Sequence, residues 1–261
     1  MGTVLRQDVA IVTGGGRGIG RAIALSLAGE GAAVGVFART ESEILETAER
    51  INAAGGRAVA LPVDVRDAAA VRAAVAETTK RLGPVTVLVN NAGTPGPAGP
   101  DWEVDPDPWF ECIDVILRGA MLLCQAVVPG MIQRGSGRII NIASISGTRA
   151  FPPIVATSIA KTALIRFSEG LAAQLRDRGL HVFAVHPGVV RTRLLESYGL
   201  TLPEEWFVGP ERAGTLCARL ASGRYDALSG RFLGIDDDLD ALLGRIDDIV
   251  ARELYTLRIQ T

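Results

Sequence analysis

A glycine-rich stretch near the N-terminus has the spacing of a phosphate-binding turn. It reads Thr13-Gly-Gly-Gly-Arg-Gly-Ile-Gly20 and lies between an apolar run and a stretch of helical period. Glycines allow a tight turn there, and they let backbone N–H groups approach a pyrophosphate at the N-terminus of the helix. We therefore expect a dinucleotide to bind at this turn. The expected ligands of its diphosphate are Gly14, Gly16, Gly18, Ile19 and Gly20.

The end of the second apolar run bears on the choice between NADP(H) and NAD(H). It reads Phe37-Ala-Arg39, where NAD-preferring sheets carry an acidic residue for the ribose 2′-hydroxyl. Ala38 has no carboxylate to repel a 2′-phosphate, and Arg39 together with Arg17 supplies two guanidinium groups that bind phosphate well. We therefore predict NADP(H) as the cofactor. The alternative is that both arginines are ordinary solvated charges.

The hydrophobic pattern predicts the elements that position these residues. Short apolar runs alternate with longer segments of helical period, as in β-α-β units that feed a parallel sheet with helices on both faces. We predict one α/β domain over residues 1–261, a Rossmann-like doubly wound parallel sheet of seven strands. The expected strands are Val9 to Thr13, Ala33 to Ala38, Ala58 to Val63, Val85 to Asn90, Arg138 to Ala143, His181 to Val185 and Arg231 to Ile235. The expected helices are Ile19 to Glu30, Glu41 to Ala54, Ala68 to Leu82, Pro106 to Gln133, Ile154 to Arg178 and Pro210 to Ala221.

Two irregular segments, Thr94 to Trp109 and Val189 to Gly209, each follow a strand, where open α/β sheets bind ligands. We expect the second, at about residues 189–209, to be a substrate lid. Aromatic and apolar residues in these segments predict a rim suited to a bulky apolar or polycyclic small-molecule substrate; the alternative is a lid that packs only on itself. The rim residues are Trp102, Trp109, Phe110, Leu194, Leu195, Tyr198, Leu200, Trp206 and Phe207, with Phe151 between the two groups in sequence.

Composition excludes several other classes of protein. The 27 basic and 29 acidic residues give a formal net charge of -2 without a long like-charge run, so we expect no nucleic-acid or membrane partner. Three cysteines and two histidines lack metal-ligand spacing, so we expect neither a metal site nor a disulfide framework. The absence of an N-terminal signal pattern and of an apolar run of about 18 residues predicts a cytoplasmic protein. Residues at about 236–254 predict a docked C-terminal helix.

Four motifs in order make the chain resemble the classical short-chain dehydrogenase/reductase family. They are the TGxxxGIG spacing of the glycine-rich turn, Asp64, Asn90-Asn-Ala-Gly93 and Pro187-Gly188. The resemblance implies that Asp64 and Val65 flank the adenine, that Asn90 lies at the sheet end beside the cofactor, and that Thr192 contacts the nicotinamide carboxamide. It also implies a homodimer or homotetramer formed through the long helices. The remaining expected cofactor contacts are Ala92, Gly93, Lys161, Pro187 and Gly188.

The same resemblance shows where the catalytic residues should be. The family carries a Tyr-x-x-x-Lys pair, a serine thirteen residues before the tyrosine and an asparagine on the preceding long helix. Counting back from Lys161 puts Thr157 at the tyrosine position and then Ser144 at the serine position, whereas Ile116 stands at the asparagine position. An aliphatic hydroxyl is a poor general acid at pH 7, and Ile116 removes a polar anchor for a proton-carrying water. The resemblance therefore implies cofactor binding with an altered proton path.

Lys161, Ser144 and Tyr198 remain as candidates for the chemistry. Lys161 is one of two lysines among 27 basic residues, which indicates a need for a compact ammonium group, and we expect it to bind the nicotinamide ribose hydroxyls. Ser144 is expected to polarise a carbonyl, or else to hydrogen-bond its own backbone. Tyr198 is the best-placed tyrosine to replace the missing acid, and the alternative is a lid tyrosine that packs on the surface.

These residues leave three functions open. The first is an atypical NADPH-dependent reductase that delivers a hydride to a carbonyl, imine or enone, with the proton from water, Tyr198 or the substrate. The second is a non-redox enzyme on the same scaffold, such as a cyclase, dehydratase or isomerase, in which Thr157, Ser144 and Lys161 shape a pocket. The third is a catalytically silent cofactor-binding protein. We favour the first because the cofactor motifs are intact.

Overall fold

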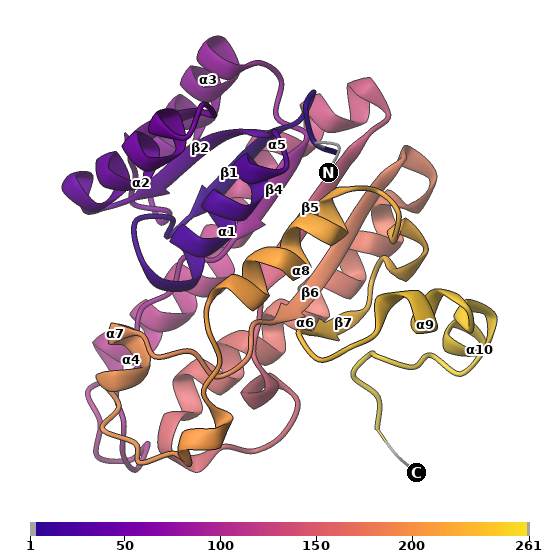
Figure 1. The fold of residues 1–261 in the computed structure, drawn as a ribbon. Helices are drawn as coiled ribbons and strands as arrows, with labels where there is room; N and C mark the ends of the chain where they lie inside the picture. The colour runs from indigo at the N-terminus through magenta and orange to yellow at the C-terminus, as the bar shows by residue number, and fades with distance from the viewer. Residues whose placement is uncertain (1–3, 260–261) are drawn as a thin grey trace.

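Seven parallel strands lie in the order β3-β2-β1-β4-β5-β6-β7 in the computed structural model, which describes residues 4–259 (Figure 1). The interior strand β1 (Val9–Thr13) is buried along its whole length and runs parallel to both neighbours. Strands covered on both faces need the near-continuous apolar runs that the sequence shows. The predicted doubly wound, Rossmann-like single domain is confirmed. The other strands are β2 (Ala33–Ala38), β3 (Arg57–Pro62), β4 (Val87–Asn90), β5 (Gly137–Ile142), β6 (Leu180–His186) and β7 (Phe232–Gly234).

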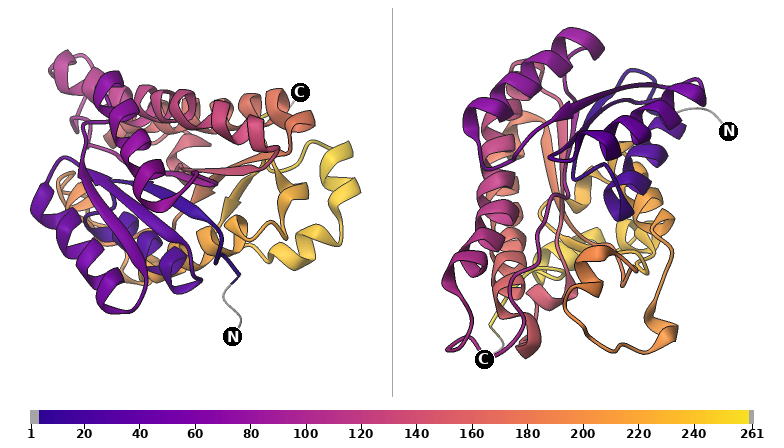
Figure 2. Two further views of the ribbon diagram at one scale, coloured as in Figure 1. Left: turned by 90° about the horizontal axis from the view of Figure 1, so that it is seen from above. Right: turned by 90° about the vertical axis from the view of Figure 1, so that its left-hand side faces the viewer.

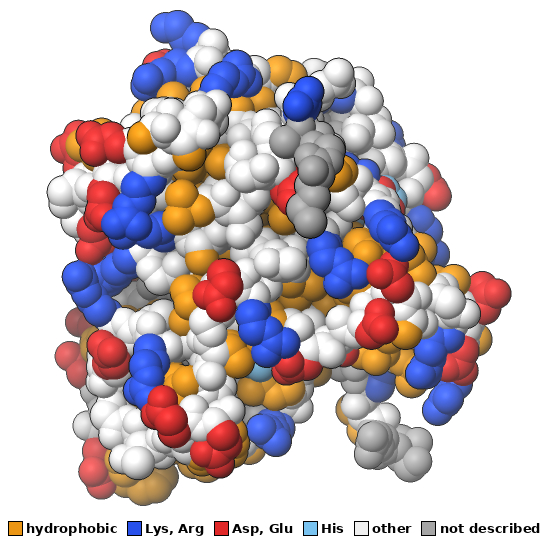
Figure 3. Space-filling model, in the orientation of Figure 1, with side chains coloured by type: hydrophobic (Ala, Val, Ile, Leu, Met, Phe, Trp, Pro, Cys, Tyr) orange, Lys and Arg blue, Asp and Glu red, His pale blue; other side chains and the backbone are white. Residues whose placement is uncertain are grey.

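Helices form a layer on each face of this sheet, as both views in Figure 2 show. One apolar core joins the sheet to α1 (Gly18–Gly29), α2 (Glu41–Ala53) and α8 (Glu211–Ala221). A second core joins its other face to α3 (Ala68–Leu82), α5 (Gly119–Arg134) and α6 (Val155–Leu175). On the face shown in Figure 3, basic and acidic side chains are interspersed rather than gathered by sign.

The long helical run after the proline-rich segment is less regular than the single helix that the sequence predicts. It consists of α4 (Pro106–Ile113), a π-helical turn (Asp114–Arg118) and α5. By length and composition alone, this run is apolar enough to cross a membrane. However, Leu123, Val127 and Met131 are buried in the core beneath the sheet. We therefore interpret it as a core helix of the domain.

The predicted C-terminal helix at about 236–254 is wrong as a single element. The structure has two short helices, α9 (Leu239–Leu243) and α10 (Ile246–Ala251), separated by Gly244 and Arg245. Arg245 leaves the helical conformation, with φ -128° and ψ 29°, whereas the apolar spacing of the sequence continues past it. The segment does dock, because Leu239 and Ile249 are fully buried in the core shared with α1 and α8.

Candidate active site

A cavity of about 990 Å³ lies at the carboxyl ends of the central strands. Its walls include Gly14 after β1, Ala92 after β4, Ser144 after β5 and Pro187 after β6. The strand order reverses its direction between β1 and β4, and open α/β sheets bind their ligands at such a switch point. All the predicted site residues except Asn90 line this one cavity.

The glycine-rich turn forms a cradle that only glycine permits. Gly14 has a φ of +63°, in the left-handed region that other residues rarely adopt. A Cβ atom at Gly20 would lie 2.1 Å from the carbonyl oxygen of Gly14, so any side chain there would break the turn. The turn leads directly into the N-terminus of α1, where free N–H groups favour an anion. This local structure fits the diphosphate of a dinucleotide.

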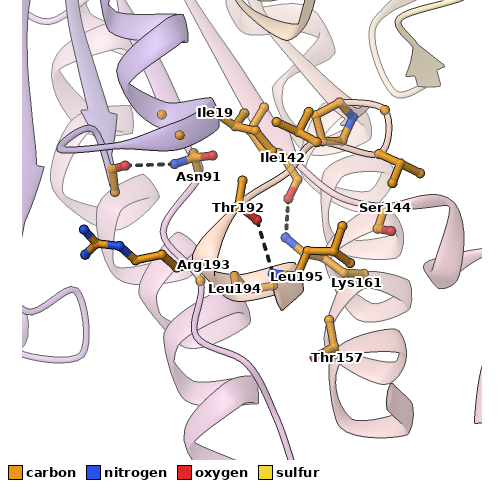
Figure 4. A pocket seen from close by; sticks show the side chains of 18 of the residues that line it. Ile19, Asn91, Ile142, Ser144, Thr157, Lys161, Thr192, Arg193, Leu194 and Leu195 are labelled. Atoms are coloured by element: carbon orange, nitrogen blue, oxygen red, sulfur yellow. Dashed lines mark hydrogen bonds between the residues drawn. The ribbon is translucent and has the colours of Figure 1, made fainter. Parts of the chain in front are cut away.

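Asn91, rather than the predicted Asn90, faces the cavity. The Asn91 side-chain amide donates a 2.9 Å hydrogen bond to the backbone oxygen of Thr13 and so ties the loop after β4 to the end of β1 (Figure 4). Asn90 is buried and donates instead to Asn141 at 2.8 Å. Neighbouring strand residues point to opposite faces, which explains the exchange of roles. Both asparagines belong to the same sequence motif, and only the structure shows which one reaches the ligand cavity.

At the predicted adenine end, Asp64 and Val65 both line the cavity. The Asp64 carboxylate accepts hydrogen bonds from the Arg66 guanidinium at 2.6 to 3.1 Å, and these bonds hold the pKa of Asp64 below its usual value. Arg66 also reaches Glu111 at 2.9 Å. Arg66 is not among the residues predicted from the sequence, although it lies only two positions after Asp64.

The two arginines predicted to bind phosphate also line the cavity, and each has a carboxylate neighbour. Arg17 lies 3.2 Å from Glu43, and Arg39 lies 3.9 Å from Glu111. They are therefore neither free phosphate ligands nor isolated surface charges. The Arg39–Glu111 pair is exposed on both sides, and exposed pairs contribute about 0–1 kcal/mol.

A hydrogen bond links the lid to the helix position where the resembled family carries tyrosine. The hydroxyl oxygens of Thr157 on α6 and Tyr198 are 2.6 Å apart. Both residues are buried, with 6% and 7% of their surface exposed, and both line the cavity. Burial raises the pKa of Tyr198, while the hydrogen bond to Thr157 acts in the opposite direction. The phenol therefore keeps its proton at neutral pH and presents a proton donor beside the cavity.

Thr157 has two further neighbours that the sequence analysis did not identify. Its hydroxyl accepts a long hydrogen bond from the backbone N–H of Gly96 at 3.4 Å and lies 3.4 Å from the thiol of Cys112. Burial raises the pKa of that thiol, so Cys112 is held as a neutral group. Ile116, in the π-helical turn, also lines the cavity and brings an apolar side chain to it.

Lys161 and Ser144 lie on the same side of the cavity (Figure 4). The Lys161 ammonium donates to the backbone oxygen of Ile142 at 2.5 Å, and burial lowers its pKa to about 8. The Ser144 hydroxyl oxygen accepts from the backbone N–H and the hydroxyl of Ser146 at 3.2 and 3.0 Å. Ser144 therefore makes a local hydrogen bond with the backbone, as in the alternative prediction. Its own hydroxyl proton is not used in these bonds and stays available for a ligand carbonyl.

Only part of the predicted aromatic rim borders the cavity. Trp102 is 84% exposed, and Trp109 packs edge-on against Phe110 with ring centroids 4.9 Å apart. Trp102 lies in the loop before α4, whereas Trp109 and Phe110 belong to α4 itself, and none of the three is among the residues that line the cavity. Phe207 also turns away, with its ring 3.9 Å from the guanidinium carbon of Arg191. The predicted rim residues that do line the cavity are Phe151, Leu194, Leu195, Tyr198, Leu200 and Trp206.

Fold and cavity together define a dinucleotide-binding α/β protein whose ligand site spans the switch point of the sheet. The family model of short chain dehydrogenases matches residues 8–202. The chain therefore belongs to the short chain dehydrogenase family, whose members are oxidoreductases that bind nicotinamide cofactors, act on small molecules and are commonly oligomeric.

Two curated relatives illustrate the match. A putative ketoacyl reductase of Streptomyces coelicolor is 37% identical over 222 residues, which cover 84% of this chain and 85% of the relative. A short chain dehydrogenase of Pseudocercospora fijiensis is 40% identical over 192 residues, which cover 73% of this chain but only 62% of that longer relative. The matched part of the second relative is therefore less than two thirds of its length.

Solved structures share the same architecture. A single-site variant of actinorhodin polyketide ketoreductase with NADPH is 32% identical, with a TM-score of 0.82 over 90% of this chain and 97% of the other. A 3-oxoacyl-[acyl-carrier protein] reductase of Brucella melitensis with bound NAD is 30% identical, with a TM-score of 0.81 over 89% and 91% of the two chains. The architecture is thus common to neighbours that hold either nicotinamide cofactor.

Proposed function

We propose that this protein is an NADP(H)-dependent reductase of carbonyl, imine or enone substrates in which Tyr198 supplies the proton. The observation that carries the proposal is the 2.6 Å contact between the hydroxyls of Tyr198 and Thr157. Tyr198 brings a phenol from the lid to the helix position where the family's tyrosine is missing. A phenol is a far better general acid than an aliphatic hydroxyl.

The roles of the other residues follow from their contacts. When bound, NADPH supplies a hydride to the electrophilic carbon of the substrate. Ser144 donates a hydrogen bond to the substrate oxygen, because its own oxygen already accepts from Ser146. Tyr198 transfers its proton to the same oxygen as negative charge develops there, and Lys161 binds the cofactor ribose. Solvent then returns the proton to the phenolate.

The NADP(H) preference has its own support. The related ketoreductase structure holds NADPH, although another neighbour holds NAD. In this chain Ala38 lines the cavity without a carboxylate, and the arginines Arg17 and Arg39 stand beside it. The balance of charge therefore favours a cofactor with a 2′-phosphate.

The cavity walls favour an apolar substrate. Its lid side carries Leu194, Leu195, Leu200 and Trp206, and Ile116 adds an apolar side chain where the family has a polar residue. Pockets lined in this way hold apolar ligands and orient them through a few polar groups. A bulky ketone or enone fits this description.

The test is NADPH oxidation with a panel of bulky ketones, imines and enones, followed by absorbance and product analysis. We expect turnover with at least one apolar member of the panel, and a large loss in Tyr198→Phe. If no substrate oxidises NADPH while a co-purified or added compound is cyclised, dehydrated or isomerised, the protein is a non-redox enzyme on this scaffold. Tight cofactor binding without any turnover would indicate a silent binding protein.

A further inference from the structure

A single carboxylate oxygen joins the phosphate-binding turn to the lid. Glu43, in the first turn of α2, places its Oε1 atom 3.2 Å from Arg17 and 3.0 Å from Arg193. Arg193 begins α7 (Arg193–Glu196) in the lid and is 150 residues away in sequence. All three residues line the cavity, and Figure 4 shows Arg193 extending away from Lys161 and Thr157.

Two guanidinium groups that contact the same anionic oxygen form an anion-binding site. The Glu43 side chain is 20% exposed, whereas those of Arg17 and Arg193 are 53% and 69% exposed. The carboxylate balances only one of the two positive charges. A phosphomonoester carries up to two negative charges and three acceptor oxygens, so it satisfies both arginines better than the carboxylate does.

The root of the lid rests directly against the phosphate-binding turn. A Cβ atom at Gly18 would lie 3.3 Å from the Cγ2 atom of Thr192, the residue before Arg193. The Thr192 hydroxyl also accepts from the backbone N–H of Leu195 at 3.2 Å and so starts α7. Arg193 is the first residue of α7, so an exchange of its ion-pair partner from Glu43 to a phosphate affects the first turn of that helix.

We propose that Arg193 is a third phosphate-binding residue and that Glu43 is its internal competitor, so that the 2′-phosphate of NADP(H) anchors the root of the lid. In the empty protein Glu43 holds Arg193 and Arg17. The 2′-phosphate takes over both arginines, and the lid closes only over the phosphorylated cofactor. This inference rests on the NADP(H) preference proposed above.

Calorimetric titration with 2′,5′-ADP and with 5′-AMP at low ionic strength tests the proposal without any need for a substrate. The parent protein should bind 2′,5′-ADP more tightly than 5′-AMP. Arg193→Gln should weaken 2′,5′-ADP binding about tenfold and leave 5′-AMP within about twofold, because one charge-assisted contact to the 2′-phosphate is lost. Glu43→Gln should tighten 2′,5′-ADP binding, since it removes the competing anion.

The matched control is Arg245→Gln. It breaks another exposed ion pair, to Asp248 at 3.0 Å, and Arg245 is not among the residues that line the cavity. This variant should bind both nucleotides like the parent.

Hydrogen–deuterium exchange of residues 191–208 separates ligand binding from simple stabilisation of the lid. Without nucleotide, Glu43→Gln and Arg193→Gln should both exchange faster than the parent. Added 2′,5′-ADP should restore slow exchange in Glu43→Gln but not in Arg193→Gln. If the parent prefers 2′,5′-ADP and Arg193→Gln keeps that whole preference, Arg193 is not a phosphate ligand and the proposal is wrong. If the parent shows no preference, the NADP(H) assignment fails and the proposal fails with it.

Discussion

The hydroxyl groups of Thr157 and Tyr198 lie 2.6 Å apart, although 41 residues separate them in the chain. By the family resemblance, Thr157 stands at the position of the proton donor, and Tyr198 belongs to the segment of residues 189–209; both residues line the cavity. The contact therefore brings a phenol to the helix whose own sequence lacks one. In the function proposed above, this contact gives the segment of residues 189–209 a chemical role.

We expect Tyr198→Phe to lower kcat by about 10²- to 10³-fold, in the range for loss of a general acid. KM and the Kd for NADPH should change little, because the ring remains and Thr157 keeps its contacts with Gly96 and Cys112. Steady-state kinetics on the best substrate of the panel gives the measurement. Tyr225→Phe is the control, since that hydroxyl contacts Arg219 and Asp240 outside the cavity. Full turnover by Tyr198→Phe would show that Tyr198 is not the proton donor.

Thr157→Tyr should not create an ordinary active site by itself. Thr157 is only 6% exposed and is in contact with Tyr198, so a second phenol overpacks the site at a cost of about 1–3 kcal/mol. The double variant Thr157→Tyr/Tyr198→Ala makes room for one phenol. It should reduce simple ketones faster than Tyr198→Ala alone, whereas Thr157→Tyr should show a lowered Tm. A folded, NADPH-binding double variant without this gain would mean that Ser144 and Lys161 are not arranged for carbonyl reduction.

Ala38→Asp should reverse the cofactor preference. A carboxylate at this cavity-lining position repels a 2′-phosphate and accepts a hydrogen bond from a ribose 2′-hydroxyl. We expect the Kd for NADPH to rise at least about tenfold and that for NADH to stay equal or fall, as measured by fluorescence titration. Ala38→Ser, which adds a polar group without charge, should retain the parent preference. An unchanged ratio in Ala38→Asp would place the 2′-phosphate elsewhere.

Lys161 should make stability depend on pH in the alkaline range. Burial lowers its pKa to about 8 in the folded protein, against 10.5 for an unperturbed lysine. Between these values the unfolded chain binds a proton that the folded protein does not, so this residue's contribution to the free energy of unfolding increases with pH there. Below about pH 8 Lys161 is protonated in both the folded and the unfolded protein, and its contribution to the free energy of unfolding is then constant and at its least favourable.

Urea denaturation of the parent and of Lys161→Met at several pH values between about 7 and 10.5 measures this effect. The variant should be most stable relative to the parent near pH 7, and its relative stability should decline as the pH rises. A difference that does not vary over this interval would show that the ammonium is not destabilised by burial.

Local sequence patterns determined most of the architecture. The bounds of β1 and α3 coincide with the predicted Val9 to Thr13 and Ala68 to Leu82, because buried strands and amphipathic helices are encoded by the periodicity of neighbouring residues. Residue spacing also located the glycine-rich turn, and the family resemblance predicts that Thr157 and Ile116 replace the expected tyrosine and asparagine. The pattern failed at Arg245, where the apolar spacing continues but the helix is interrupted.

Contacts between distant segments were decided by the tertiary structure alone. Strand pleat put Asn91 rather than Asn90 at the cavity, and the path of the proline-rich loop turned Trp102 outward. By itself the sequence predicted a dinucleotide site and, through the family resemblance, a threonine in place of its usual acid. Only the fold brought Tyr198 to Thr157, and Arg193 to Glu43, because such pairs depend on how the lid packs across the strand ends and leave no periodic signal in the chain.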